Sequence, residues 1–352
     1  FNGFFWGWPI LILLMGGGLL ITIRTGFMQF RYLPFILKET FGKMFKSDVG
    51  GEGTVSPFQA ASAALASSIG AANITVAPSI IFVAGPGAIF WMWVAGILGQ
   101  ATKFGEIVLG IKYREKNVDG EFVGGPAYTF KKGIGGTLGN IMGFLVSFFF
   151  MIEILPSITL QTIAAAGPLE QLGLSRLIAA LIILVLVVLV SYGGIKRIGQ
   201  VTEKMVPIMA GIYIIMGLII LIMHAGQIPH AFGVIFKGAF NPQAVAGGIG
   251  GATLAAAIKA GLARGCYSNE AGMGSAPYAH STAITDHPAR QGMWGIFEVI
   301  ADTIIVCSIS VLIVIVTDNW HDAGNSGIAV ERAFNTAFGQ FGTAIIAISL
   351  FL

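Results

Sequence analysis

Charged residues are scarce in this sequence of 352 residues. Lysine, arginine, aspartate and glutamate make up 11% of it, whereas hydrophobic residues reach 55%. An average soluble domain carries roughly 25% charged residues, so this chain has too few charges to solvate a globular surface, and lipid must surround much of it. The net charge of +3 is small, and the basic residues lie in short loops without interleaved aromatic residues, which argues against a nucleic-acid partner.

Cysteine is nearly absent, and motifs for catalysis are missing. The two cysteines, Cys266 and Cys307, lie in or beside apolar segments and provide neither a disulfide framework nor a metal-spaced cluster. No Walker lysine follows the glycine-rich segments, the five histidines have no ligand spacing, and the context suggests no Ser-His-Asp triad. The sequence therefore predicts a protein that is not an enzyme.

Long apolar runs are abundant. A helix needs about 20 apolar residues to cross ~30 Å of hydrocarbon, and we predict an all-α polytopic membrane protein with about nine spans in a single transmembrane domain, residues 1–352. The predicted spans are residues 4–23, 57–84, 87–111, 138–166, 176–193, 205–224, 243–262, 290–317 and 328–352. The chain starts at Phe1 without methionine and stops inside an apolar run, so we expect a trimmed start and missing C-terminal spans.

Lysine and arginine alternate between the two sides of these spans. One set of loops holds sixteen of them, and the other set holds three, Arg176, Lys237 and Arg332. Because short cytoplasmic loops carry the excess of positive charge, the pattern predicts a multi-pass protein of the plasma membrane with its N-terminus outside.

Two predicted spans contain glycine-rich breaks, at residues 67–75 and 246–253. The breaks are five spans apart, which is the arrangement of an inverted-repeat transporter with broken helices. A helix broken at bilayer depth exposes N–H groups that suit a carboxylate and C=O groups that suit a dehydrated cation, so we predict an amino acid and sodium as the cargo. Close helix packing through small residues is the alternative explanation.

Three carboxylates, Glu153, Glu298 and Asp302, fall inside apolar spans. A charge there is costly and is a functional candidate by default, although a buried structural hydrogen bond is the alternative. Lys103 and Glu106 lie three residues apart on one helix face, which predicts a neutralising pair.

Two further features stand out. Pro156 removes a backbone hydrogen bond near Glu153 and predicts a kink in the fourth span, with Gln161 about a turn and a half further on.

The polar, glycine-rich segment 261–277 predicts an ordered cytoplasmic loop or interfacial helix that gates the inward pathway.

Several motifs together resemble the alanine or glycine:cation symporter family over nearly the whole chain. They are Phe58-Gln-Ala, Gly85-Pro-Gly-Ala-Ile-Phe-Trp-Met-Trp93, Ala101-Thr-Lys-Phe, Gly125-Pro-Ala127, Ala263-Arg-Gly, Ser268-Asn-Glu-Ala-Gly-Met-Gly-Ser-Ala-Pro277, Thr285-Asp-His-Pro288, Arg290-Gln-Gly, Gly295-Ile-Phe-Glu and Asp302-Thr-Ile-Ile-Val-Cys307. The resemblance implies a LeuT-like core preceded by one extra helix, eleven spans in all, of which this sequence holds about nine.

The resemblance also implies where the cargo binds. Substrate is expected at the unwound part of the second span, with partners from the fourth and seventh spans. These residues are Gly70, Ala71, Ala72, Asn73, Ile74, Glu153, Pro156, Gln161, Gly248, Gly250 and Gly251. Sodium is expected between the backbone carbonyls of Ala66 and Ile69 and hydroxyls of the ninth span, which the resemblance places just beyond Leu352.

The chain departs from the family pattern at the break, where it has Gly70-Ala-Ala-Asn-Ile74 instead of Gly-Thr-Gly-Asn-Ile. In the fourth span, Glu153 and Pro156 stand where the family has an Asn and Gln pair. The prediction is sodium-coupled symport of a small neutral amino acid, alanine or glycine, by alternating access. The alternatives are proton coupling or another substrate on the same fold, a channel, or a non-transporting scaffold relative.

Overall fold

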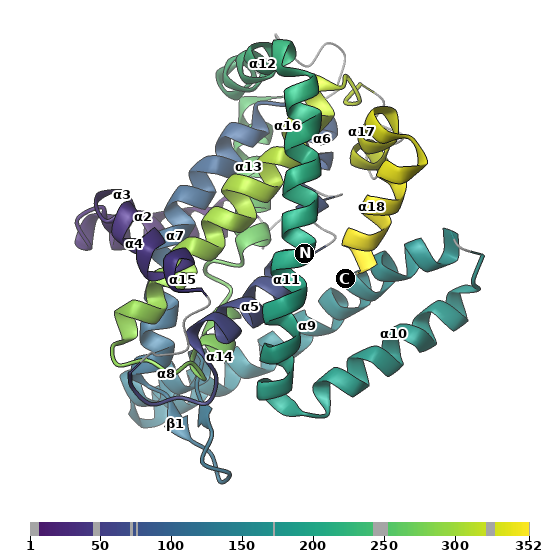
Figure 1. Ribbon diagram of the computed structural model, residues 1–352. Helices are drawn as coiled ribbons and strands as arrows, with labels where there is room; N and C mark the ends of the chain where they lie inside the picture. Colours follow the sequence, from purple (N-terminus) through teal and green to yellow (C-terminus); the bar gives the residue numbers. More distant parts are fainter. Residues whose placement is uncertain are drawn as a thin grey trace.

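The computed structural model describes residues 7–44, 50–70, 73–74, 77–171, 173–241, 253–321 and 328–351 as a helical bundle (Figure 1). The helices of the first half are α2 (Trp8–Arg24), α3 (Met28–Arg31), α4 (Leu33–Glu39), η1 (Phe41–Lys43), α5 (Pro57–Ser68), α6 (Ser79–Ala84), α7 (Ala88–Lys112), α8 (Pro126–Gly133) and α9 (Gly136–Gln171). Those of the second half are α10 (Arg176–Ser191), α11 (Gly194–Met223), η3 (Ala225–Gln227), α12 (Ile228–Phe240), α13 (Leu254–Asn269), α14 (Ala276–His280), α15 (Pro288–Val299), η5 (Ile300–Val306), α16 (Cys307–Val316), α17 (Ala329–Phe338) and α18 (Gln340–Phe351). A short hairpin pairs β1 (Glu115–Lys116) with antiparallel β2 (Phe122–Val123).

Four helical segments of the described chain are long and apolar enough to cross a membrane: Ala88–Lys112, Gly136–Glu170, Gly194–Met223 and Pro288–Val316. Three shorter apolar helices are α2, α10 and α18. The prediction of a helical protein with several long apolar helices is confirmed in this coarse form. The count of nine spans and the LeuT-like inverted repeat stay predictions.

The predicted break in residues 67–75 is confirmed, because the expected span 57–84 consists of two helices, α5 and α6. Helix α5 starts at a capping box, in which the Ser56 hydroxyl accepts from the Gln59 amide and the Gln59 side chain accepts from the Ser56 amide, each at 3.1 Å. It ends at Ser68, because Ile69 has a non-helical backbone (φ −84°, ψ 82°).

Helix α7 is the central element, packed against α2, α13 and α15. Small residues allow its close approach to α13. A Cβ atom added at Gly261 would lie 2.1 Å from the Ala88 carbonyl oxygen, and one at Gly265 would lie 2.5 Å from the Ala95 Cβ. Contact through glycine is how helices approach each other in membranes.

This packing corrects the prediction for residues 261–277. Helix α13 continues to Asn269, so the first half of the expected loop is helical, with Arg264 and Ser268 buried. The small residues bury one face of α13 against α7, and this hides polar side chains that sequence reasoning placed in water. Residues 242–252, where the seventh span was expected to start, lie outside the described residues.

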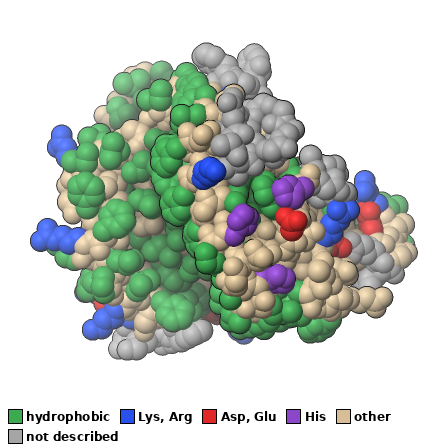
Figure 2. Space-filling model, turned by 90° about the horizontal axis from the view of Figure 1, so that it is seen from above, with side chains coloured by type: hydrophobic (Ala, Val, Ile, Leu, Met, Phe, Trp, Pro, Cys, Tyr) green, Lys and Arg blue, Asp and Glu red, His purple; other side chains and the backbone are tan. Residues whose placement is uncertain are grey.

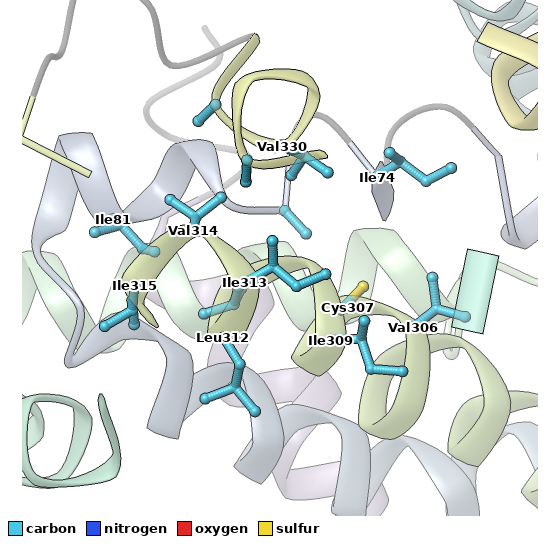
Figure 3. Close-up of a cluster of buried hydrophobic side chains, with 14 of the residues drawn as sticks. Ile74, Ile81, Val306, Cys307, Ile309, Leu312, Ile313, Val314, Ile315 and Val330 are labelled. Atoms are coloured by element: carbon cyan, nitrogen blue, oxygen red, sulfur yellow. The ribbon is translucent and has the colours of Figure 1, made fainter. Parts of the chain in front are cut away.

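The largest apolar core lies between α6, α7, α11, α16 and α17. Figure 3 shows part of it, with side chains of α16 meeting Ile81 and Val330. One buried polar pair crosses this core: the Tyr213 and Ser310 hydroxyls are 2.6 Å apart, and the Tyr213 ring stacks on Phe334 at 5.7 Å between centroids.

Basic loops gather at one end of the bundle, where Figure 1 shows β1, α8 and the start of α11. Three ion pairs join these loops: Lys116 with Glu52 at 3.1 Å, Lys132 with Glu115 at 2.8 Å, and Lys196 with Glu121 at 3.0 Å. Figure 2, a view onto the opposite end, shows a mostly hydrophobic face with histidine side chains, and with lysines or arginines mainly toward its edges. The assignment of the basic end to the cytoplasm stays a prediction.

Candidate functional site

A cavity of about 180 Å³ lies beside the break after α5. Ala66, Ile69 and Gly70 line it from the break, Gln161 and neighbours line it from α9, and α11 and α18 close it. Four residues predicted for substrate or sodium, Ala66, Ile69, Gly70 and Gln161, are therefore brought together.

The Gln161 side chain packs directly against Gly70. A Cβ atom at Gly70 would lie 2.6 Å from Gln161 Nε2 and 2.8 Å from Oε1, so only glycine leaves room for the amide there. The contact places a hydrogen-bonding side chain of α9 against the backbone of the break. The break and the fourth predicted span thus form one site.

The break changes the hydrogen bonding of two carbonyls. In a continuing helix the Gly70 and Asn73 amides would donate to the carbonyls of Ala66 and Ile69. Instead, the Gly70 amide donates to Ser68 O at 3.1 Å and the Asn73 amide to Gly70 O at 3.0 Å. These carbonyls, predicted as sodium ligands, thus lose their helical donors beside the cavity.

A hydroxyl faces the same cavity from α18. Ser349 is 4% exposed, and its Oγ has no hydrogen-bond partner in the structure described here. The family resemblance places such hydroxyls just beyond Leu352, and this stays a prediction; the expected span 328–352 consists of two helices. Gly339 (φ +61°) separates α17 from α18 and turns Ser349 toward the break.

Asn73 is buried at 1% exposure in a second, polar part of the site. Its side-chain Nδ2 donates to Ser68 O at 2.7 Å and to the Asp302 carboxylate. Ile74, predicted with it, is 2% exposed and packs into the apolar core, where Figure 3 labels it. Asn73 thus joins a polar network, whereas Ile74 packs into the apolar core.

Helices α13 and η5 surround Asp302 with hydroxyl groups. The Ser268 Oγ lies 2.8 Å from one carboxylate oxygen, Oδ2, and the Thr303 Oγ1 donates to the same oxygen at 2.7 Å. The Asn269 amide donates to Thr303 Oγ1 at 3.2 Å. Asp302, a carboxylate candidate from the sequence, is therefore connected to the break through Asn73.

The pair predicted between Lys103 and Glu106 is wrong. Lys103, 1% exposed, forms an ion pair with Glu298 at 3.1 Å and donates to the backbone oxygen of Asn269 at 2.9 Å. Glu106 accepts the Gly272 amide at 3.2 Å instead. Glu298, the second carboxylate candidate, is thus the partner that neutralises Lys103 at membrane depth.

Two residues of this network were missed by sequence reasoning. His280 Nε2 bonds the Glu298 carboxylate, and Gln291 Nε2 contacts His280 Nδ1 at 2.8 Å and Pro57 O at 3.1 Å. No spacing pattern marks them, because their partners come from distant segments. They connect the Lys103 pair to the start of α5.

Two of the remaining predicted residues, Glu153 and Pro156, lie away from the cavity. Glu153 is partly buried and Pro156 is exposed, and neither lines it. Helix α9 continues through Pro156. The other predicted positions, Ala71, Ala72, Gly248, Gly250 and Gly251, lie outside the described residues.

The donors at the break fit a hard monovalent cation. Backbone carbonyls and a hydroxyl are oxygen ligands of the kind such cations prefer. The described residues contain no group of three or more His, Cys, Asp and Glu side chains that could hold a metal ion.

Comparison with known proteins gives one family over the whole chain. The profile described as the Sodium:alanine symporter family matches residues 1–352. The Sodium/alanine symporter AgcS of Methanococcus maripaludis is 44% identical over 315 residues, covering 89% of this chain and 68% of AgcS.

Two Bacillus subtilis relatives match at similar length. The Uncharacterized transporter YflA is 44% identical over 349 residues, covering 98% of this chain and 73% of YflA. The Probable sodium/glutamine symporter GlnT is 35% identical over 356 residues, covering 100% of this chain and 72% of GlnT.

Proposed function

Because this chain belongs to the sodium:alanine symporter family, we propose that it carries alanine or glycine together with sodium by alternating access. The family consists of multi-pass membrane transporters, and the protein is not an enzyme. Our proposal includes a single transmembrane domain over residues 1–352, a LeuT-like inverted repeat, and a plasma-membrane topology with the N-terminus outside.

The cavity at the break carries this proposal. Its volume of about 180 Å³ is below the roughly 300–1,000 Å³ of pockets for drug-sized ligands, which favours a small substrate. The Gln161 amide against Gly70 offers polar groups for the ammonium or carboxylate of an amino acid. A broken helix at this depth is the usual binding element of inverted-repeat transporters.

Sodium would bind between α5 and α18. The Ala66 and Ile69 carbonyls have lost their helical donors, and the Ser349 hydroxyl faces the same cavity. These oxygens would replace part of the hydration shell of the ion. Since they belong to two separate helices, ion binding would draw α18 toward the break and couple sodium to closure.

The relatives are named for different substrates: AgcS for alanine and GlnT for glutamine. Measuring which amino acid binds to the purified full-length protein distinguishes between these substrates. We expect alanine or glycine to raise the melting temperature in sodium buffer and to have little effect in potassium buffer. A glutamine response without an alanine or glycine response would refute the proposed substrate.

Ser349→Ala is expected to raise the sodium concentration for half-maximal alanine uptake roughly tenfold, equivalent to about 1.4 kcal/mol. The substitution removes one proposed ligand and little volume. Thr336→Ala is the matched control, because its hydroxyl on neighbouring α17 is exposed and bonds the Arg332 carbonyl. An unchanged sodium dependence in Ser349→Ala would exclude this hydroxyl as a ligand.

A further inference from the structure

Asp302 is the end point of a buried hydrogen-bond network. It is 0% exposed, and the Asn73 amide and the Ser268 and Thr303 hydroxyls are all placed to donate to its carboxylate. An ionised carboxylate only accepts hydrogen bonds, so this set of donors matches the charged form. The nearby ammonium of Lys103 forms its ion pair with Glu298.

The helix that carries Asp302 is irregular at this point. Residues Ile300–Val306 form a π-helical stretch between α15 and α16. Such stretches are uncommon and occur frequently at functional sites, since the extra residue per turn changes which side chains face a neighbour. Here Asp302 and Thr303 both lie buried, Asp302 bonded to Asn73 and Thr303 to Asn269 of α13.

Asp302 determines how the Asn73 carboxamide is turned. Asn73 Nδ2 donates to Asp302 and to Ser68 O, while Asn73 Oδ1 faces the Ser268 hydroxyl at 3.1 Å and Arg264 Nη2 at 3.4 Å. A carboxylate cannot donate, so the reversed amide would place its Oδ1 against the carboxylate. The Asp302 carboxylate, together with the Ser68 carbonyl, therefore favours one of the two orientations of Asn73.

Asn73 in turn holds the end of α5. Its bond to Ser68 O reaches the last helical residue before the cavity-lining residues Ile69 and Gly70. We propose that Asp302 is a positioning residue of the transport site, whose carboxylate orients the Asn73 carboxamide and thereby fixes the end of α5 beside the cavity. This inference rests on the proposed function and adds a residue to it.

The charged and titratable groups around Asp302 come from four elements. They are Lys103 of α7, Glu298 of α15, Arg264 of α13 and Cys307 of α16, whereas α5 contributes none. The Lys103 ammonium forms its ion pair with Glu298. The hydrogen-bond donors at Asp302 are therefore the neutral amide and hydroxyl groups. Protonation of Asp302 turns one carboxyl oxygen into a donor and weakens the charge-assisted bond from the Asn73 amide, so the orientation is held most strongly at higher pH and less strongly as pH falls.

The test is alanine uptake by the full-length protein in proteoliposomes under a fixed sodium gradient. For Asp302→Asn we expect at least a tenfold increase in KM for alanine, with a smaller change in Vmax per folded protein. In the wild type KM should rise as pH falls, and in Asp302→Asn it should stay high and flat with pH. Glu106→Gln is the matched control, an isosteric change on α7 outside this network.

A double-mutant cycle tests whether Asp302 acts through Asn73. We expect Asn73→Ala to raise KM as much as Asp302→Asn, and the double variant to be no worse than either. If Asp302→Asn does not fold, Thr303→Val keeps the carboxylate and removes one donor, with an expected KM increase of about threefold.

Additive effects in the cycle, or a wild-type KM in Asp302→Asn or Thr303→Val, would overturn the inference. Wild-type protein that takes up neither alanine nor glycine would instead refute the proposed function itself. The two failures are therefore distinguishable.

Discussion

Lys103→Met is expected to prevent accumulation of the folded protein in the membrane. The substitution leaves the Glu298 carboxylate, 0% exposed, without the ammonium that lies 3.1 Å away. Breaking a buried ion pair by removing one partner costs about 3–5 kcal/mol, a large part of the stability of most proteins. Abundance in membranes and the melting temperature in detergent measure the effect.

The double variant Lys103→Met/Glu298→Gln is the informative comparison. It removes both charges, so we expect it to recover much of the lost abundance, because two neutral groups replace an unpaired charge. Lys196→Met is the matched control, since its pair with Glu121 is at the surface and is worth about 1 kcal/mol or less. A double variant no more stable than Lys103→Met would contradict the assigned pairing.

Gly261→Val is expected to separate α13 from α7 and to destabilise the protein by at least the roughly 1–3 kcal/mol typical of overpacking. The new Cβ would lie 2.1 Å from the Ala88 carbonyl oxygen and 2.6 Å from the Trp91 Cβ. The backbone oxygen cannot turn away as a side chain could, so the helices must move. The melting temperature and uptake should fall together.

Gly211→Val on α11 is the control for this prediction. A Cβ at Gly211 meets no atom within 4 Å, so the same substitution adds a side chain without a collision. We expect abundance and melting temperature close to those of the wild type. If both variants were equally destabilised, the contact of α13 with α7 at Gly261 would not be the cause.

Local sequence patterns predicted the parts of the site that depend on composition. Small and polar residues in an apolar run marked the break after Ser68. The family resemblance implied that Gln161 of the fourth predicted span and the carbonyls of Ala66 and Ile69 lie at this break, and the structure brings them together there. The break itself could be predicted because it depends on residues that are neighbours in the chain.

Pairings between distant segments could not be predicted in the same way. Spacing alone suggested Glu106 for Lys103, whereas the packing of α7 against α15 brought Glu298 to it. The position of Ser349 depended on the turn at Gly339, and the burial of Ser268 depended on α13 extending to Asn269. The Lys103 pairing, the position of Ser349 and the burial of Ser268 all depend on how the helices pack. Short sequence patterns do not predict that packing.

The most direct test of the central claim is uptake of labelled alanine and glycine into proteoliposomes that contain the full-length protein. Uptake should accumulate substrate against its gradient when an inward sodium gradient is imposed, and it should collapse when potassium replaces sodium. Uptake that is equal with and without the sodium gradient, or uptake of neither amino acid, would contradict sodium-coupled symport through the break after α5.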